Sequence, residues 1–487
     1  MNSKKTGLLA LTLLAVLSFV GCPKPVAPVK PFGVTQGVRG VVLSCSTRAV
    51  DQNAGQVSYQ FDWGDNSQSA WSAYMDAALV SGDTHTYAEA GQFKITARMR
   101  ASGKSGASAW SDGLTITVVA EGAVIWSFGY AWPDDPEDSA DFSGSTIGLA
   151  PNGSVAISTD FGLVFKPKSG GTFAFTTPDL DAFAVAPAFN DSGYLFIGCD
   201  NDTFYCLKPN VTRSWGAQGT VSAPAALGAD GAVFYQADDS LVARNADGTR
   251  RWAAYTGGSE TQPVIARDGT VIAITDVAGV LAFDQASGTQ KWSQVYAGRS
   301  VFSSSAINPD RNELYVPLDD GSVAALDLGA NGDQVWHATG LGADPSGLVV
   351  GLDGLVYVGA GGKLIALDPA ANGAPKWTFA PALAGSASTP AVASSGIVYF
   401  VVGSSKRVKL VGPDSLYGVN SDGSQRWACA LGEGGGPDIM SAPKLDDNGL
   451  IYVGSGVKCW CVGGNGGPGA AAWPMYGRDA RNSGRAR

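Results

Sequence analysis

Apolar residues along most of this chain come in short runs that are separated by polar turns. The segments 268–274, 353–358 and 448–453 each open with Asp-Gly or Asn-Gly and continue as an apolar run. These dipeptides are tight-turn signals because both residues tolerate a positive φ. Nearer the N-terminus, apolar residues alternate with polar ones from Phe93 to Met99, which is the pattern of a half-buried strand. The chain is therefore predicted to be all-β.

A second landmark, Gly-x-x-x-Trp, returns at intervals of 40 to 50 residues, at 248–252, 288–292, 332–336, 373–377 and 423–427. Two earlier copies diverge, because Phe175 stands at the tryptophan place and Trp215 has no glycine four residues before it. An interval of this length corresponds to one four-stranded unit of a radial array. The sequence thus predicts a β-propeller over residues 120–487, with eight blades as the main count and seven as the alternative.

The ends of the repeat region indicate how the ring closes. Trp126, on the apolar run 123–128, is expected to supply the outer strand that completes the last blade. The last unit is expected to reach Trp473, and the basic end 478–487 to cap the closing strand.

The run 282–292, which ends in Gly-Thr-Gln-Lys-Trp, resembles the tryptophan-docking motif of the propeller family named for pyrroloquinoline quinone enzymes. The segment 473–485 is similar to one that recurs in that family, so the resemblance spans roughly residues 121–487. It implies that the repeat tryptophans pack between blades. These structural tryptophans are Trp215, Trp252, Trp292, Trp336, Trp377 and Trp427.

The family contains enzymes and non-enzymes. Its dehydrogenases use a bridge between adjacent cysteines and a calcium ion, but no Cys-Cys pair occurs here. The acidic run from Asp134 to Asp138 is interpreted as a solvated loop, although calcium binding stays open. His85 and His337 are the only histidines, which is little material for a zinc site or a Ser-His-Asp triad. No catalytic residue, cofactor or metal site is predicted.

Residues 33–119 are predicted to form a separate β-sandwich. The segments 60–66 and 85–96 are similar to the two signatures of the polycystic-kidney-disease (PKD) domain, which implies an immunoglobulin-like fold. Asp62 and Asp65 are expected to fix a turn, and His85 is expected to be a structural turn residue.

The N-terminus carries an export signal. Lys4 and Lys5 precede an apolar run that ends just before Cys22, so residues 1–21 are predicted to be a signal peptide. Cys22 resembles the acylated cysteine of a bacterial lipobox, with ordinary secretion or an uncleaved anchor as alternatives. The Pro-rich residues 22–32 are expected to form an extended tether that holds the folded parts off the bilayer. The predicted location is the bacterial cell envelope, at the outer membrane, on either its periplasmic side or the cell surface.

The net charge of the chain argues against nucleic acid as a partner. A formal net charge of −10, with 16% charged residues, offers no attraction for nucleic acid.

Of the seven cysteines, Cys199 and Cys206 flank a turn, which makes them a candidate disulfide in an oxidising compartment.

The favoured function is a non-catalytic, lipid-anchored scaffold that binds envelope proteins through its propeller. The resemblance supports this, because the family includes the lipid-anchored propeller of the outer-membrane barrel-assembly machinery. One alternative is a carbohydrate- or matrix-binding surface protein, with Tyr130 and Trp132 stacking on sugar rings. Another is a divergent quinoprotein oxidoreductase.

Overall fold

The structure is a computed structural model of the whole chain. It divides into two compact units, one containing residues 1–33, 44–85 and 93–116, and the other residues 34–43, 86–92 and 117–487. The residues that it describes are 24–129, 147–159, 162–167, 174–175, 185–221, 223–258, 261–275, 279–296, 303–383, 385–403, 413–433, 441–455, 458–469, 471–479 and 481–486.

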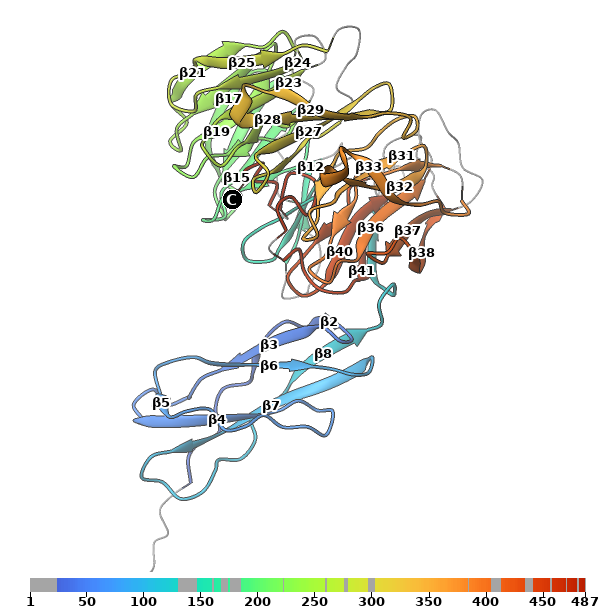
Figure 1. Cartoon of the computed structure of the whole chain (residues 1–487). Helices are drawn as coiled ribbons and strands as arrows, with labels where there is room; N and C mark the ends of the chain where they lie inside the picture. The colour runs from blue at the N-terminus through green and yellow to red at the C-terminus, as the bar shows by residue number, and fades with distance from the viewer. Residues whose placement is uncertain are drawn as a thin grey trace, which may run out of the picture. The chain divides into compact units, whose positions relative to one another are not determined.

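The N-terminal part is a sandwich of two sheets, in which β4 and β7 lie side by side (Figure 1). Apolar residues point inward at alternate positions of β7 and β8, as the sequence pattern predicts. One sheet has the order β1-β3-β6 and the other β2-β8-β7-β4-β5. The strands are β1 (Phe32–Gly33), β2 (Gln36–Val38), β3 (Val42–Thr47), β4 (Gln56–Asp62), β5 (Met75–Asp76), β6 (Ser81–Thr86), β7 (Gly91–Ala101) and β8 (Leu114–Val119).

The aspartates of the first PKD-like signature fix a turn, as expected. Asp62 Oδ1 accepts a hydrogen bond from the Gly64 amide at 3.0 Å, and Asp65 Oδ1 accepts one from the Ser67 amide at 3.0 Å. His85, however, lies within strand β6 and not in a turn. Its ring stacks on Trp63, with centroids 4.9 Å apart.

The described part of the Pro-rich segment, residues 24–32, does not extend freely from the sandwich. Pro25, Pro28 and Pro31 are buried, while the residues between them are exposed or half-buried. A polyproline helix has three residues per turn, so every third side chain lies on one face. The Val29 amide donates to the Arg48 carbonyl at 3.0 Å, so this proline face is packed on the sandwich.

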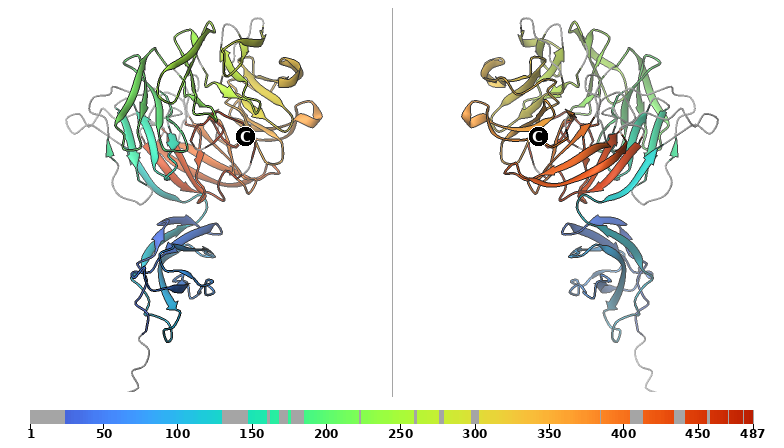
Figure 2. Two further views of the ribbon diagram at one scale, coloured as in Figure 1. Left: turned by 90° about the vertical axis from the view of Figure 1, so that its left-hand side faces the viewer. Right: turned by 90° about the vertical axis from the view of Figure 1, so that its right-hand side faces the viewer.

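The remaining strands form a propeller of eight sheets in the described residues, named blades 1 to 8 here, which lie side by side around a ring (Figure 2). The second strand of each blade is wholly buried and most third strands are largely so, because sheets cover both of their faces. The first four blades are β10 (Ile147–Leu149), β11 (Val155–Thr159), β12 (Gly162–Lys166) and β13 (Ala174–Phe175); β14 (Ala188–Phe189), β15 (Leu195–Cys199), β16 (Thr203–Leu207) and β17 (Arg213–Gln218); β18 (Ala226–Leu227), β19 (Val233–Ala237), β20 (Ser240–Arg244) and β21 (Arg250–Tyr255); and β22 (Val264–Ile265), β23 (Val271–Thr275), β24 (Gly279–Phe283) and β25 (Gln290–Gln294).

The other four blades continue the pattern, and in blade 7 two short strands share the innermost place. They are β26 (Ala306–Asn308), β27 (Glu313–Leu318), β28 (Ser322–Asp327) and β29 (Asp333–Ala338); β30 (Val349–Val350), β31 (Val356–Ala360), β32 (Lys363–Asp368) and β33 (Ala374–Phe379); β34 (Ser386–Ala387), β35 (Ala391–Val392), β36 (Val398–Gly403), β37 (Pro413–Val419) and β38 (Gln425–Glu433); and β39 (Lys444–Leu445), β40 (Leu450–Ser455), β41 (Lys458–Gly463) and β9 (Val124–Gly129).

The described residues include only short 3-10 helices, η1 (Leu328–Ala330) and η2 (Pro369–Ala371). None of the helical segments in that part of the chain has the length and apolar character of a membrane-crossing helix.

The ring closes through a strand from before the first blade. β9 pairs antiparallel with β41, and Trp126 lies opposite Cys461. Blade 8 therefore combines residues from both ends of the propeller, which confirms the prediction that the Trp126 run supplies the closing outer strand. Pairing the two ends in one sheet leaves no open seam in the ring.

At six seams an indole ring packs on a glycine of the following blade. A Cβ atom at any of these glycines would lie 2.4 to 3.1 Å from the ring, and all six have φ between +72° and +88°. Each Gly-x-x-x-Trp motif therefore contacts two neighbouring motifs. Its glycine lies against the tryptophan of the blade before it, and its tryptophan packs on the glycine of the blade after it. The pairs are Trp215 on Gly248, Trp252 on Gly288, Trp292 on Gly332, Trp336 on Gly373, Trp377 on Gly423 and Trp427 on Gly122.

Hydrogen bonds fix the orientation of three of these indoles. Nε1 of Trp215, Trp252 and Trp377 donates to a carbonyl in the next blade's turn at 3.0, 3.0 and 2.9 Å. These three seams therefore combine a large buried apolar area with a directional bond.

The C-terminal segment does not cap the closing strand. It runs along the innermost strands, where its carbonyls accept hydrogen bonds from the amides of Phe189, Leu227, Ile265, Val350 and Val392 at 2.7 to 2.9 Å. The reason is that an innermost strand is a sheet edge with unpaired amides, which a passing backbone can satisfy.

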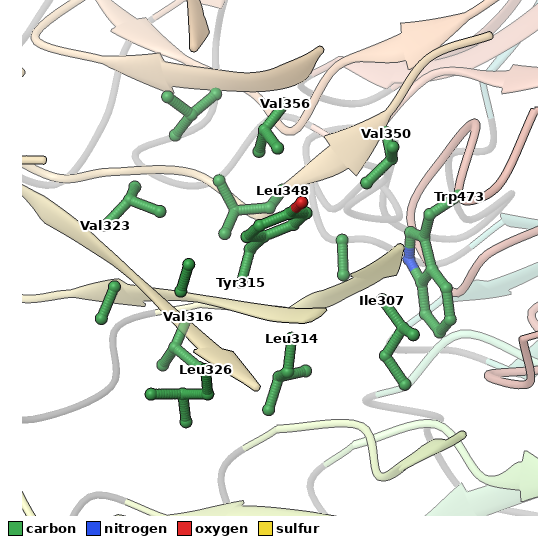
Figure 3. Packing of buried hydrophobic residues seen from close by; sticks show 14 of the residues in the cluster. Ile307, Leu314, Tyr315, Val316, Val323, Leu326, Leu348, Val350, Val356 and Trp473 are labelled. Atoms are coloured by element: carbon green, nitrogen blue, oxygen red, sulfur yellow. The ribbon is translucent and has the colours of Figure 1, made fainter. Parts of the chain in front are cut away.

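Trp473 is therefore not the seam tryptophan of the last unit. It lies beside Val350 and Ile307 in the largest apolar cluster (Figure 3), and it is 1% exposed.

The candidate disulfide between Cys199 and Cys206 is wrong. Cys206 lies directly opposite Phe196 and shares its face of the hairpin, whereas Cys199 lies an odd number of residues from Phe196. Side chains alternate between the faces of a strand, so the two sulfur atoms enter different apolar clusters.

The seam geometry predicts a large cost for adding one methyl group at Gly288. Gly288→Ala would place a Cβ 2.5 Å from Trp252 Cδ2 at a φ of +72°, so we expect the free energy of unfolding to fall by about 3 kcal/mol. Gly354→Ala is the matched control, because φ there is +75° and nothing lies within 4 Å of the new Cβ. It should cost about 1 kcal/mol. Equal losses in urea unfolding would contradict the seam contact.

Candidate binding surface

The turns of the propeller fall on two faces of the ring. Successive strands of a blade are antiparallel, so the turns between its first and second strands and between its third and fourth strands share one face. We call this side the turn face. It carries the Asp-Gly turns seen in the sequence; at one of them Asp268 Oδ1 accepts a hydrogen bond from the Thr270 amide at 2.9 Å.

Three of the cavities that the described residues form lie on the turn face. The largest, about 420 Å³, lies between the first turns of blades 8 and 1 and is bordered by Arg478, Asp479 and Arg481 of the C-terminal segment. A second, of about 300 Å³, lies at the seam of blades 1 and 2 across the turn 150–154 from the first. A third, of about 290 Å³, lies between the turns of blades 5 and 6. Recesses of this size accept side chains of a partner.

The second cavity lies at a seam that lacks a tryptophan in the sequence. Its lining includes Phe165, Leu207 and Val211, and Val211 stands where other blades carry the seam glycine. Val211 adopts a φ of +64°, which is rare for a β-branched residue. The backbone of this divergent repeat therefore keeps the left-handed turn although the glycine has been replaced.

The turn face is rich in carboxylates. Many of its basic side chains are held in ion pairs, including Arg251 with Asp230 at 2.6 Å and Arg426 with Glu121 at 2.5 Å. Other carboxylates, such as Asp247, accept bonds within their own turns. Hydrogen bonds from Thr249 hold the pKa of this exposed carboxyl below its usual value, so it stays ionised. The resulting negative field favours basic partners.

A buried polar cluster fixes the C-terminal segment at the centre of the ring. Asn482 is 0% exposed; its Nδ2 donates to the carbonyls of Ile147 and Pro187 at 3.1 and 2.9 Å. Its Oδ1 accepts from Lys444 Nζ, which also donates to the Tyr476 carbonyl at 2.5 Å. Burial lowers the pKa of Lys444 to about 7, although the charge of Asp479 acts in the opposite direction.

Asp479 shapes the same segment. Its carboxylate accepts from the Ser483 hydroxyl at 2.7 Å and contacts Arg478 at 3.2 Å. Burial raises the pKa of Asp479, but the bonds from Ser483 and the nearby arginine charges outweigh it and leave the pKa below its usual value. The described part of the C-terminal segment is thus bonded to the innermost strands of the ring.

Each of the two histidines lies within hydrogen-bonding distance of a polar side chain. His337 Nε2 lies 2.8 Å from Ser322 Oγ, but that hydroxyl donates to Asp320, so serine and not histidine is the middle group. In the sandwich the middle group is Asp65, whose Oδ2 lies 2.6 Å from His85 Nε2. A triad needs the histidine between nucleophile and carboxylate.

Several residues singled out in the sequence lie outside the described ranges, namely Cys22, the acidic run 134–138, Tyr130 and Trp132. Within the described ranges no group of three or more His, Cys, Asp or Glu side chains is placed to hold a metal ion.

One seam element was missed in the sequence although its signal was present. Residues 122–126 read Gly-Ala-Val-Ile-Trp, which is a further Gly-x-x-x-Trp, and Gly122 receives Trp427 across the closing seam. The motif is easily overlooked because its strand stands far in sequence from the blade that it completes.

The fold and its seams define a repeat β-propeller with tryptophan-docked blades. The family model described as outer membrane protein assembly factor BamB matches residues 112–347 and 319–456, and the chain belongs to this family. No curated protein matches the chain.

Among the solved structures that share the fold are two propellers. The first is BamB from Moraxella catarrhalis, at 16% identity and a TM-score of 0.52, covering 70% of this chain and 99% of that one. The second is the Dos1 propeller, at 12% identity and a TM-score of 0.54, covering 71% of this chain and 97% of that one.

The buried lysine predicts a pH dependence of stability. With a pKa near 7 when folded and 10.5 when unfolded, Lys444 leaves the unfolded chain with more bound protons above pH 7, so its contribution to stability rises with pH. The unfolding free energy of the native chain minus that of Lys444→Met should increase by up to about 1.4 kcal/mol per pH unit between pH 7 and 8.5.

Lys458→Met is the control, because Lys458 is exposed, and the corresponding difference should stay constant over this range. A flat difference for Lys444→Met would show that the lysine is not desolvated at the centre of the ring.

Proposed function

We propose that this chain is a non-catalytic scaffold of the bacterial cell envelope that binds a partner protein over its turn face. The observation that carries the proposal is the position of the C-terminal segment: its described residues run along the innermost strands and occupy their free amides. The recesses described above lie instead on the turn face, around blades 8, 1 and 2 and between blades 5 and 6.

The family supports the same proposal. Its printed name is that of an outer membrane protein assembly factor. We extend from it only the general role, a binding platform without chemistry, and the envelope location. Lipidation of Cys22 would hold the platform on a membrane, with the outer membrane as the proposed one.

The turn face favours a partner with exposed basic and apolar side chains. Carboxylates line its turns, and the recess between blades 1 and 2 has Phe165, Phe189 and Leu207 in its wall. A basic segment could approach along the carboxylates while an apolar side chain enters the recess, which combines steering with an anchor.

The proposal predicts crosslinks from one face only. A photo-reactive residue in place of Asn152, on the exposed turn between the two neighbouring cavities, should trap a discrete envelope protein in living cells. The matched control replaces Asp239, which is equally exposed on the turn between β19 and β20, at the opposite face. Adducts from Asp239 alone, or the same background from both positions, would contradict binding over the turn face.

Charge neutralisation gives a second readout. Asp247→Asn, Asp284→Asn and Asp422→Asn keep the Oδ1 that accepts each turn's bonds. Combined, they should lower the yield of the Asn152 adduct without changing the stability of the propeller by more than about 1 kcal/mol.

A further inference from the structure

One end of the sandwich combines the docked Pro-rich segment with two loops. The chain enters strand β1 antiparallel to β3, so residues 24–29 run beside residues 48 and beyond. The Ala77 amide donates to the Gly55 carbonyl at 2.9 Å, which brings the loop after β5 to the same end. We call the surface made by residues 24–29, 48–55 and 76–80 the tether end.

The tether end exposes aliphatic side chains that the sandwich core does not need. The core is closed there by Ala49 and Ala77, which are 2% and 0% exposed and pack with Val57 and Met99. The neighbouring large side chains point to solvent. They are Val26, Val50, Leu79 and Val80, exposed by 59%, 59%, 56% and 52%.

Single exposed valines are ordinary, but four aliphatic side chains at one end of a small domain indicate a contact surface. Exposed Lys24, Arg48 and Lys104 lie around this end, with Asp51 and Asp76 as the nearby acids. The local balance is therefore basic, against a chain with a net charge of −10. Basic residues around apolar ones suit an anionic lipid surface.

The docked proline face fixes the distance to the proposed anchor. Pro25 is buried, and only three residues' length of chain separates it from Cys22. A fully extended chain of that length spans at most about 11 Å. An acylated Cys22 would thus hold the tether end within the thickness of the headgroup layer.

We propose that the tether end of the sandwich lies on the lipid surface and that Val26, Val50, Leu79 and Val80 enter the interfacial layer. This rests on the proposed lipidation of Cys22. The sandwich is then a foot that stands on the bilayer, in place of a domain suspended above it. The occupant of the surface is lipid, because the segment that would carry the acyl chains leaves from this same end.

The test uses the acylated full chain in phosphatidylethanolamine–phosphatidylglycerol vesicles. A spin label is placed through Val50→Cys, and through Val42→Cys as the control. Val42 is 60% exposed but lies at the opposite end of β3. On transfer from solution, as the unacylated Cys22→Ser form, to vesicles, the label at position 50 should lose access to an aqueous relaxation agent by at least about fivefold. The label at position 42 should not change.

Leu79→Cys provides a second position that should behave like Val50→Cys. Both positions are exposed, so neither substitution removes core packing. Equal access at positions 42, 50 and 79 in chains that float with the vesicles would overturn the proposal. Protection at positions 50 and 79 that is already complete without vesicles would also overturn it, because a protein contact would then cover the end.

The mass of the N-terminal peptide separates this proposal from the proposed function. A peptide without acyl chains removes the anchor and with it the lipid contact, whereas crosslinking from Asn152 would be unaffected. Loss of the Asn152 adduct with protection intact at position 50 would instead contradict the proposed function and leave the lipid contact of the tether end supported.

Discussion

At six seams of the propeller an indole ring rests on a glycine that the next blade holds at positive φ, and the closed ring depends on this contact. The glycine must lack a Cβ for two reasons, its backbone conformation and the ring against it. The contact also links neighbours in order, since blades 3 to 7 each give one indole and receive one. Stability of the ring is therefore distributed over equivalent seams, as expected of a repeat protein. The divergent seam between blades 1 and 2 is where a cavity lies, beside Val211 in the strained place of the glycine.

The inner side of the ring is held by backbone hydrogen bonds and not by indole–glycine contacts. The innermost strands are sheet edges, and the C-terminal segment satisfies their amides while Asn482 and Lys444 fasten it. A buried lysine is costly unless its hydrogen-bonding groups are matched, and here a carbonyl and an amide oxygen accept from it. With the centre occupied in this way, the surfaces left for a partner are outside the channel. The geometry of the ring thus favours binding at the turn face over chemistry at the axis.

The packing of the Pro-rich segment determines the end of the sandwich from which the N-terminus leaves. A free Pro-rich tether would allow the domain many orientations, but the face formed by Pro25, Pro28 and Pro31 is packed on the sandwich. This packing fixes which end of the sandwich the N-terminus leaves from, and the exposed aliphatic residues gather at that end. The proposed anchor at Cys22 and the proposed lipid contact of the sandwich would thereby belong to one structural unit.

Local sequence determined the strands, the turns and the seams, because each depends on residues close together in the chain. Asp-Gly turns, buried apolar runs and Gly-x-x-x-Trp were sufficient to predict the all-β fold, the propeller and the closing role of the Trp126 run. Tertiary structure alone decided where the C-terminal segment lies, which face of its hairpin each of Cys199 and Cys206 occupies, and that the proline face is docked. The reason is that a sheet edge accepts any backbone, so the bonds that hold residues 473–486 to the inner strands leave little trace in side-chain identity. The cysteine spacing indicated a hairpin, but only the register of that hairpin showed that the two sulfur atoms point to opposite faces.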